Sequence, residues 1–242
     1  MATTHSTVPS SPRAAGWAES SPELLALRIP ADATTLAGFR AWVTSDDFPE
    51  KLRVTFIRGE IDIDMSKEEV QTHAAVKAQV CFVLMAINHE AKLGKFYLDG
   101  VLITNEAAEV SNNPDAVFLT RESLRTGRVR FVPRPKGEGQ SVEVEGTPDW
   151  VMEIVSDSSV QKDTQRLRAA YHKAGIPEYW LIDARGEKIV FQILHWRKTG
   201  YVAAPNRDGW QRSRVFDRSF RLEREWDDDL KLWDYTLHLQ PE

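Results

Sequence analysis

The chain has 242 residues, of which 42% are hydrophobic and 28% charged, and its formal net charge is -5. This composition is typical of a globular protein and excludes a fibrous or wholly disordered chain, while the length suits one α/β domain. Because the net charge is negative, a polyanionic partner would need a local basic surface or a bound metal ion.

The single cysteine, Cys81, excludes an internal disulfide and a Cys-rich zinc site. It lies in an apolar run, which predicts a buried thiol in a cytoplasmic protein. No stretch reaches the roughly 20 apolar residues that a membrane-spanning helix needs, and the N-terminus lacks an apolar signal segment. We therefore expect neither a membrane partner nor secretion.

The first 22 residues are rich in Ser, Thr, Pro and Ala and lack periodic hydrophobicity, which predicts a disordered tail before a single domain over residues 23–242. Thr34 or Thr35 is placed to cap a short helix that ends near Val43. Alternating residues on either side of Arg58-Gly59 then predict a β-hairpin.

Residues 71–93 carry apolar side chains three and four positions apart, which predicts a long helix, and a second helix is expected at 163–174. After it, residues 178–204 indicate a strand and an antiparallel meander, and further strands follow Trp210. Three other strand candidates are 96–104, 115–119 and 150–155. The segment between the last two lacks periodicity. The pattern predicts a mixed α/β sheet flanked by helices, with added antiparallel β-hairpins.

Signatures of phosphate-binding loops, zinc proteases and serine hydrolases are missing from the sequence, so its chemistry rests on carboxylates in apolar strands. Asp115 opens one such strand, and Glu153 lies inside another. A buried carboxylate is costly unless it is paired or binds a metal ion. Two carboxylates from adjacent strands would form the hard oxygen site that Mg²⁺ or Mn²⁺ prefers.

Spacing alone leaves alternatives open. Asp115 could cap the strand entry while Glu153 pairs with an arginine. Asp149 follows Pro148 just as Asp115 follows Pro114, and it lies on the same strand face as Glu153. An Asp149/Glu153 pair therefore competes with the Asp115/Glu153 pair.

Two segments, 148–156 and 174–183, together with Asp163 and Tyr171, resemble the signature of the Uma-type family of restriction endonucleases in the PD-(D/E)XK nuclease superfamily. The resemblance covers roughly residues 50 to 195. Its weaker upstream matches are Arg58-Gly59-Glu60, Met65-Ser66, His73 and Pro114-Asp115.

The resemblance implies a restriction-endonuclease-like fold and a Mg²⁺- or Mn²⁺-dependent endonuclease that hydrolyses DNA phosphodiester bonds. It implies metal ligation by Asp115, Glu153 and the backbone carbonyl of Ile154. Asp149 becomes the second choice. Two residues are secondary candidates: Glu60 for the outer shell of the metal, and His73 for contact with a phosphate or the metal site. By spacing alone, Glu60 is a solvated turn residue and His73 a cap-region residue.

The position of the lysine that the resemblance implies departs from the family pattern. The superfamily motif would place it at position 155, and the Uma-type family commonly at position 167, but Val155 and Leu167 stand there. Lys162 is the best remaining candidate for orienting water, unless it is only a solvated residue at a helix start. The departure leaves open a catalytically weakened nuclease-fold module that binds nucleic acid or protein, or a hydrolase with another substrate.

A basic stretch between the two carboxylate strands is the candidate DNA contact. Its cations are Arg121, Arg125, Arg128, Arg130, Arg134 and Lys136. We expect a flexible segment, which could instead be a solvated loop balanced by Glu138, Glu143 and Glu145. DNA is thus the expected partner, and a homodimer is left open.

Overall fold

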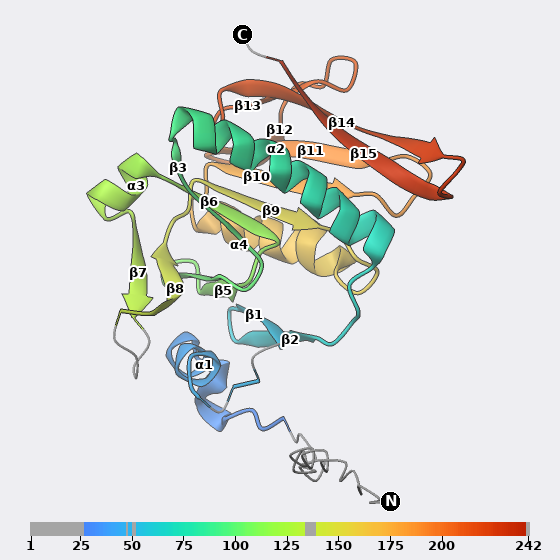
Figure 1. Ribbon diagram of the computed structural model, residues 1–242. Helices are drawn as coiled ribbons and strands as arrows, with labels where there is room; N and C mark the ends of the chain where they lie inside the picture. Colours follow the sequence, from blue (N-terminus) through green and yellow to red (C-terminus); the bar gives the residue numbers. More distant parts are fainter. Residues whose placement is uncertain (1–26, 47, 50–51, 134–138, 241–242) are drawn as a thin grey trace, which may run out of the picture.

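The computed structural model describes residues 27–46, 48–49, 52–133 and 139–240. The tail expected over residues 1–22, as well as Arg134 and Lys136, lie outside the described residues. The chain forms a central sheet, a second sheet beside it and a three-stranded sheet near the C-terminus (Figure 1).

The central sheet has the strand order β12-β11-β10-β9-β6-β3. β9 and β10 run parallel, and every other neighbouring pair is antiparallel. All of β9 is buried, and every residue in it except Glu153 is apolar, as expected for a strand covered on both faces. The six strands are β3 (Gly94–Leu98), β6 (Ala116–Thr120), β9 (Trp150–Ile154), β10 (Glu178–Asp183), β11 (Val190–Arg197) and β12 (Gly200–Ala203).

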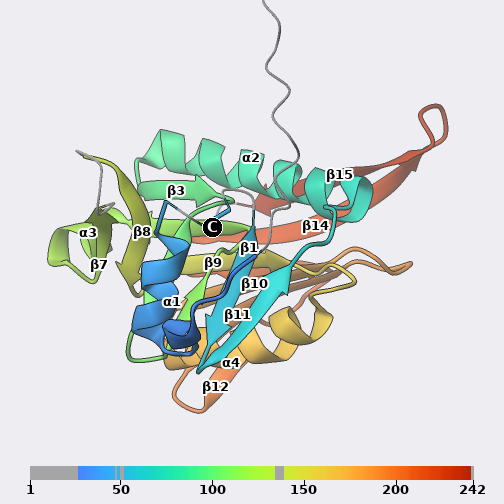
Figure 2. The same ribbon diagram turned by 90° about the horizontal axis from the view of Figure 1, so that it is seen from below.

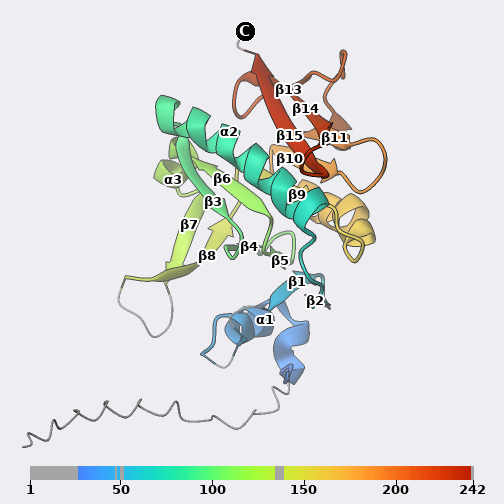
Figure 3. The same ribbon diagram turned by 45° about the vertical axis from the view of Figure 1, so that its right-hand side comes forward.

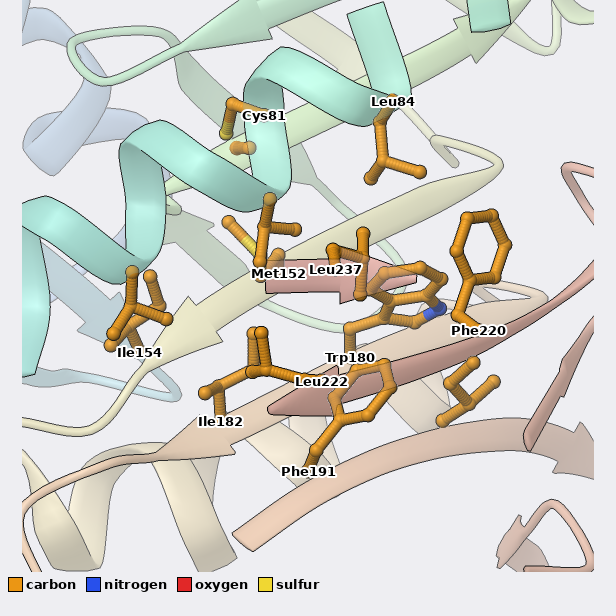
Figure 4. Packing of buried hydrophobic residues seen from close by; sticks show 14 of the residues in the cluster. Cys81, Leu84, Met152, Ile154, Trp180, Ile182, Phe191, Phe220, Leu222 and Leu237 are labelled. Carbon is orange, nitrogen blue, oxygen red and sulfur yellow. The ribbon is translucent and has the colours of Figure 1, made fainter. Parts of the chain in front are cut away.

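Helix α2 (Ala75–Ala91) covers one face of this sheet. Beside it lies the three-stranded sheet of β13 (Gln211–Ser213), β14 (Arg218–Asp227) and β15 (Leu232–Gln240) (Figure 3). Leu84, Met152 and Phe220 gather around Trp180, which is fully buried (Figure 4). Burying each such side chain contributes about 1.5–3 kcal/mol to folding.

The opposite face of the central sheet packs against α4 (Arg168–Lys173), which follows an irregular helical turn, η3 (Lys162–Leu167). η3 and α4 connect the parallel strands β9 and β10. The helix predicted at 163–174 and the strand predicted to begin at residue 178 are therefore confirmed.

The second sheet has the order β2-β1-β5-β4-β8-β7. Arg58 and Gly59 both have positive φ, 50° and 87°, as a tight two-residue hairpin turn requires, which confirms the predicted hairpin. Seen from below, β2 leads toward the start of the long helix (Figure 2). The strands are β1 (Arg53–Ile57), β2 (Glu60–Asp64), β4 (Leu102–Asn105), β5 (Val110–Asn112), β7 (Val129–Pro133) and β8 (Ser141–Gly146).

A short N-terminal helix, α1 (Leu36–Val43), packs on β1 and follows a 3-10 turn, η1 (Ala31–Thr34). The Thr35 side chain accepts a 3.1 Å hydrogen bond from the Gly38 N–H. This cap confirms the second of the two predicted cap residues.

Two predictions of local structure were wrong. The strand expected at 96–104 is divided at Gly100, whose φ of +84° lets the chain turn from β3 in one sheet to β4 in the other. The segment expected to be flexible after β6 forms α3 (Arg121–Thr126), β7 and β8. The Thr120 side chain starts α3 by accepting a hydrogen bond from the Ser123 N–H.

The long helix begins with an irregular turn, η2 (Val70–Ala74). Contrary to our expectation, Val70–Ala91 is long and apolar enough, by length and composition alone, to cross a membrane. A core helix passes the same test, and 44% of its most apolar window is buried. Val76, Val80 and Leu84 are completely buried against the central sheet.

Candidate active site

Asp115 and Glu153 lie at the same end of two paired strands. The antiparallel register of β6 and β9 pairs Ala116 with Met152, so Asp115, one residue before β6, comes opposite Glu153. The Ile154 N–H donates a 2.7 Å hydrogen bond to Asp115 Oδ2, which ties the two strand ends together. Both carboxylates are buried, with exposed fractions of 6% and 3%.

A cavity of about 440 Å³ opens at this point, between the β1–β2 hairpin, the start of the long helix and η3. Its basic lining residues are Arg53, Lys67, His73 and Lys162. Its acidic lining residues are Asp62, Asp64, Glu68, Glu69, Asp99, Asp115, Glu153 and Asp163. Because acids outnumber bases, the cavity attracts cations and would repel a phosphodiester that entered without one.

The two oxygens of Glu153 have different surroundings. Oε1 accepts hydrogen bonds from Tyr171 Oη at 2.5 Å and from Asn112 Nδ2 at 2.8 Å. In the part of the chain that the structure describes, Oε2 accepts none. Burial, and then the charge of Asp163, raise the pKa of Glu153 well above its usual value. A cation near Oε2 would favour the ionised carboxylate.

The surroundings of Asp115 shift its pKa in the opposite direction. Burial raises its pKa, but His73, Lys77 and the Ile154 N–H together outweigh burial and lower the pKa to about 2. His73 Nε2 lies 3.5 Å from Oδ2, and Lys77 Nζ lies 3.1 Å from Oδ1. Asp115 is therefore ionised at neutral pH.

Lys162 lines the same cavity, and its Nζ lies 3.5 Å from Asp163 Oδ1. Burial lowers the pKa of Lys162, but the charges of Glu153, Asp163 and other acids raise it overall, so the ammonium stays protonated. Burial raises the pKa of Asp163 to about 6. The lysine singled out in the sequence thus lies among the carboxylates.

Val155 and Leu167 are 1% and 0% exposed and pack in the core between the sheet and α4. A lysine at either position would place an ammonium inside an apolar cluster, at a large desolvation cost. In this chain both of the family's lysine positions are therefore filled by apolar core residues.

The secondary candidates separate clearly. His73 is buried, contacts Asp115 and places its Nδ1 2.9 Å from Glu68. Glu60 is exposed, does not line the cavity and pairs with Arg166 at 2.7 Å.

Asp149 has a structural role at the other end of β9. It accepts hydrogen bonds from the Thr120 N–H at 2.7 Å and the Ser123 hydroxyl at 2.8 Å, and so ties β9 to the start of α3. Glu153 lies four residue steps farther along the strand, about 13 Å away. The alternative Asp149/Glu153 pair is therefore wrong.

Sequence reasoning missed Asn112 and Lys77, which contact Glu153 and Asp115. Asn112 ends a short buried strand, and no sequence pattern marked it as a site residue. Lys77 did give a signal, because it shares a helical stripe with Cys81 and Leu84, both buried. A lysine on an apolar stripe indicates a buried partner.

Arg121, the first basic residue after β6, lies away from Asp115 and Glu153. Arg121 follows the last residue of β6 and Asp115 precedes the first, a separation of about 20 Å along the strand. Among the other cations that the structure describes, Arg125 pairs with Glu122, Arg128 with Asp149 at 3.3 Å and Arg130 with Glu145 at 2.6 Å. DNA contact by these residues stays a prediction.

The donor set fits a divalent metal ion. Within the described ranges, no group of three His, Cys, Asp or Glu side chains is arranged to hold a metal ion. The expected ligands are instead two carboxylates and the Ile154 carbonyl, all hard oxygens. Glu153 Oε2, which accepts no hydrogen bond from the described residues, and the raised pKa of Glu153 both suit a cation at this point.

The comparisons agree with this fold. The model of the Uma2 family, described as "Putative restriction endonuclease", matches residues 37–225. A crystal structure described as "a putative nuclease belonging to DUF820" from Anabaena variabilis ATCC 29413 matches with a TM-score of 0.53 and 18% sequence identity. The match covers 75% of this chain and 90% of that one. A search of curated proteins gave no match. The chain belongs to the Uma2 restriction-endonuclease family and has the mixed α/β fold of a nuclease.

Proposed function

We propose that this protein is a Mg²⁺-dependent endodeoxyribonuclease whose metal ligands are Asp115, Glu153 and the Ile154 carbonyl. The observation that carries the proposal is the pair of buried carboxylates at one end of β6 and β9, inside a cavity lined mainly by acids. The family assignment supports nuclease chemistry.

The side chains around the pair have distinct roles in this proposal. A Mg²⁺ or Mn²⁺ ion bound there would lower the pKa of a coordinated water and neutralise charge on the scissile phosphate. Tyr171 and Asn112 hold Glu153 Oε1, which leaves Oε2 for the ion. Lys162 stays protonated and donates to the attacking water or to a phosphate oxygen.

DNA binding in this proposal uses cations outside the cavity. Arg121 lies about 20 Å from Asp115, which corresponds to about six base pairs of duplex. Arg121 and Arg125 would therefore contact phosphates that flank the cleaved bond. A cytoplasmic location belongs to the proposal because Cys81, the only cysteine, is a buried free thiol.

The test is a cleavage assay on supercoiled plasmid, linear duplex, single-stranded DNA and RNA, with Mg²⁺, Mn²⁺ or a chelator. Asp115→Asn and Glu153→Gln should abolish metal-dependent cleavage of DNA. Asp157→Asn is the control, since Asp157 is a neighbouring surface carboxylate with a 96% exposed side chain, and this variant should cleave normally. Metal-dependent cleavage by both site variants would contradict the proposal.

A non-catalytic nucleic-acid-binding or protein-binding module is the second candidate. It is favoured by Val155 and Leu167 in the family's lysine positions, and by the contact of Lys77 with one oxygen of Asp115. DNA retention without cleavage in either Mg²⁺ or Mn²⁺ would support this module and exclude the nuclease.

A further inference from the structure

Lys77 is a buried cation enclosed by carboxylates from three separate segments. Its side chain is 8% exposed. Its Nζ lies 2.5 Å from Glu68 Oε1, 2.8 Å from Asp99 Oδ2 and 3.1 Å from Asp115 Oδ1. These acids come from the segment before η2, the turn after β3 and the start of β6.

This geometry satisfies the ammonium completely. A lysine ammonium has three N–H donors and no acceptor, and three carboxylate oxygens lie within its reach. Burial lowers the pKa of Lys77, but Asp115, Asp99 and Glu68 raise it overall, so the group keeps its charge. Lys77 is thus a fixed positive charge beside one of the two expected metal-binding carboxylates.

The position of this charge bears on how many metal ions the site takes. In two-metal nucleases the ions lie about 3.5–4 Å apart and are clamped by shared ligands. Here Asp115 Oδ1 contacts Lys77. Glu153 Oε2, which accepts no hydrogen bond from the described residues, belongs to the other carboxylate of the pair. A second divalent ion on Asp115 Oδ1 would meet the ammonium and its cage of acids.

We propose that the Lys77 ammonium takes the place of a second divalent cation, so that the site binds one metal ion. This inference rests on the proposed function, because it assumes an ion between Asp115 and Glu153. Lys77 acts through Asp115 and the acids around it, and is a positioning residue.

The test is the binding of Mn²⁺ alone to the metal-free full-length protein, with the free ion counted by electron paramagnetic resonance. Wild type should bind one ion. Lys77→Met and Lys77→Gln should bind two, because the acids that held the ammonium become available. Lys67→Met is the matched control, since Lys67 lines the same cavity but is exposed and forms no ion pair among the described residues. It should bind one ion.

The outcomes separate this inference from the proposed function. If wild type binds two ions, the inference about Lys77 is overturned, even if the Lys77 variants fail to fold. Lys77→Gln is included because its amide keeps N–H donors among the three acids, which limits the risk of misfolding. If wild type binds one ion and the folded Lys77 variants also bind one, only this inference fails. Wild type that binds no Mn²⁺ contradicts the proposed function and this inference together.

Discussion

Tyr171 donates a 2.5 Å hydrogen bond to Glu153 from the helix that crosses from β9 to β10. Tyr171 also accepts a 2.6 Å hydrogen bond from Asn112, so the orientation of the carboxylate depends on two strands and a helix. Such contacts to a metal-binding residue usually change metal affinity or activity by about 10–100-fold when removed.

Tyr171→Phe should therefore weaken Mn²⁺ binding and DNA cleavage at least about 10-fold, because Glu153 loses a partner that orients it. The stability loss should be only about 1 kcal/mol. Tyr201→Phe is the control, since its buried hydroxyl donates to the Ile176 carbonyl away from the cavity. Calorimetric titration and urea unfolding separate the effects. Equal loss of metal affinity in both variants would refute a specific role for Tyr171.

Asp149→Ala should destabilise the protein without changing the metal site. The Thr120 N–H and the Ser123 hydroxyl lose a buried acceptor, a cost of about 1–3 kcal/mol. Urea unfolding should show this loss, whereas Mn²⁺ titration of the folded variant should give the wild-type affinity. A folded variant that no longer binds Mn²⁺ would restore Asp149 as a ligand.

The stability of the metal-free protein should depend on Asp163 between pH 4 and 6. Its pKa is about 6 in the folded protein against an ordinary value of 3.8, mainly because of burial. A raised carboxyl pKa means that the folded state binds more protons in this interval, so stability falls as pH rises from about 4 to about 6. Asp163→Asn should lack this component. Thermal unfolding across the interval, with chelator present, measures it, and identical pH profiles for both proteins would rule it out.

Arg121 and Arg125 should contribute to DNA binding through phosphates. The double variant Arg121→Ala/Arg125→Ala should lower the slope of log affinity against log salt by about 0.9 for each lost contact. Arg207→Ala/Arg218→Ala provides a charge-matched comparison, with Arg207 in the loop before β13 and Arg218 at the start of β14. Fluorescence anisotropy of a labelled duplex at several salt concentrations gives both slopes, and equal slopes would remove α3 from the DNA contact.

Much of the central sheet could be predicted from the sequence, because β6, β9 and β10 are short apolar runs. In the second sheet, the β1–β2 hairpin could be predicted because Arg58-Gly59 carries a clear turn signal. The division of the strand expected at 96–104 could not be predicted, since apolar residues continue on both sides of Gly100. β7 and β8 were missed because their pattern is half-buried and irregular.

The site was only partly visible in the sequence. Glu153 was conspicuous as a carboxylate in an apolar strand, but the choice between Asp115 and Asp149 depends on the register of β6 and β9, which sequence periodicity does not give. Asn112 and Lys77 reach the site through tertiary contacts between distant segments.

The most direct test of the central claim compares thermal unfolding and DNA cleavage in wild type and Glu153→Gln, with and without Mn²⁺. Glutamine keeps an acceptor for Tyr171 and Asn112 but removes a charge that burial disfavours. The metal-free variant should therefore be at least as stable as wild type. Mn²⁺ at about 100 times its Kd should raise the free energy of unfolding of wild type by about 2.7 kcal/mol and leave that of the variant unchanged. The variant should not cleave DNA. Equal stabilisation of both proteins by Mn²⁺, or cleavage by the variant, would contradict the account.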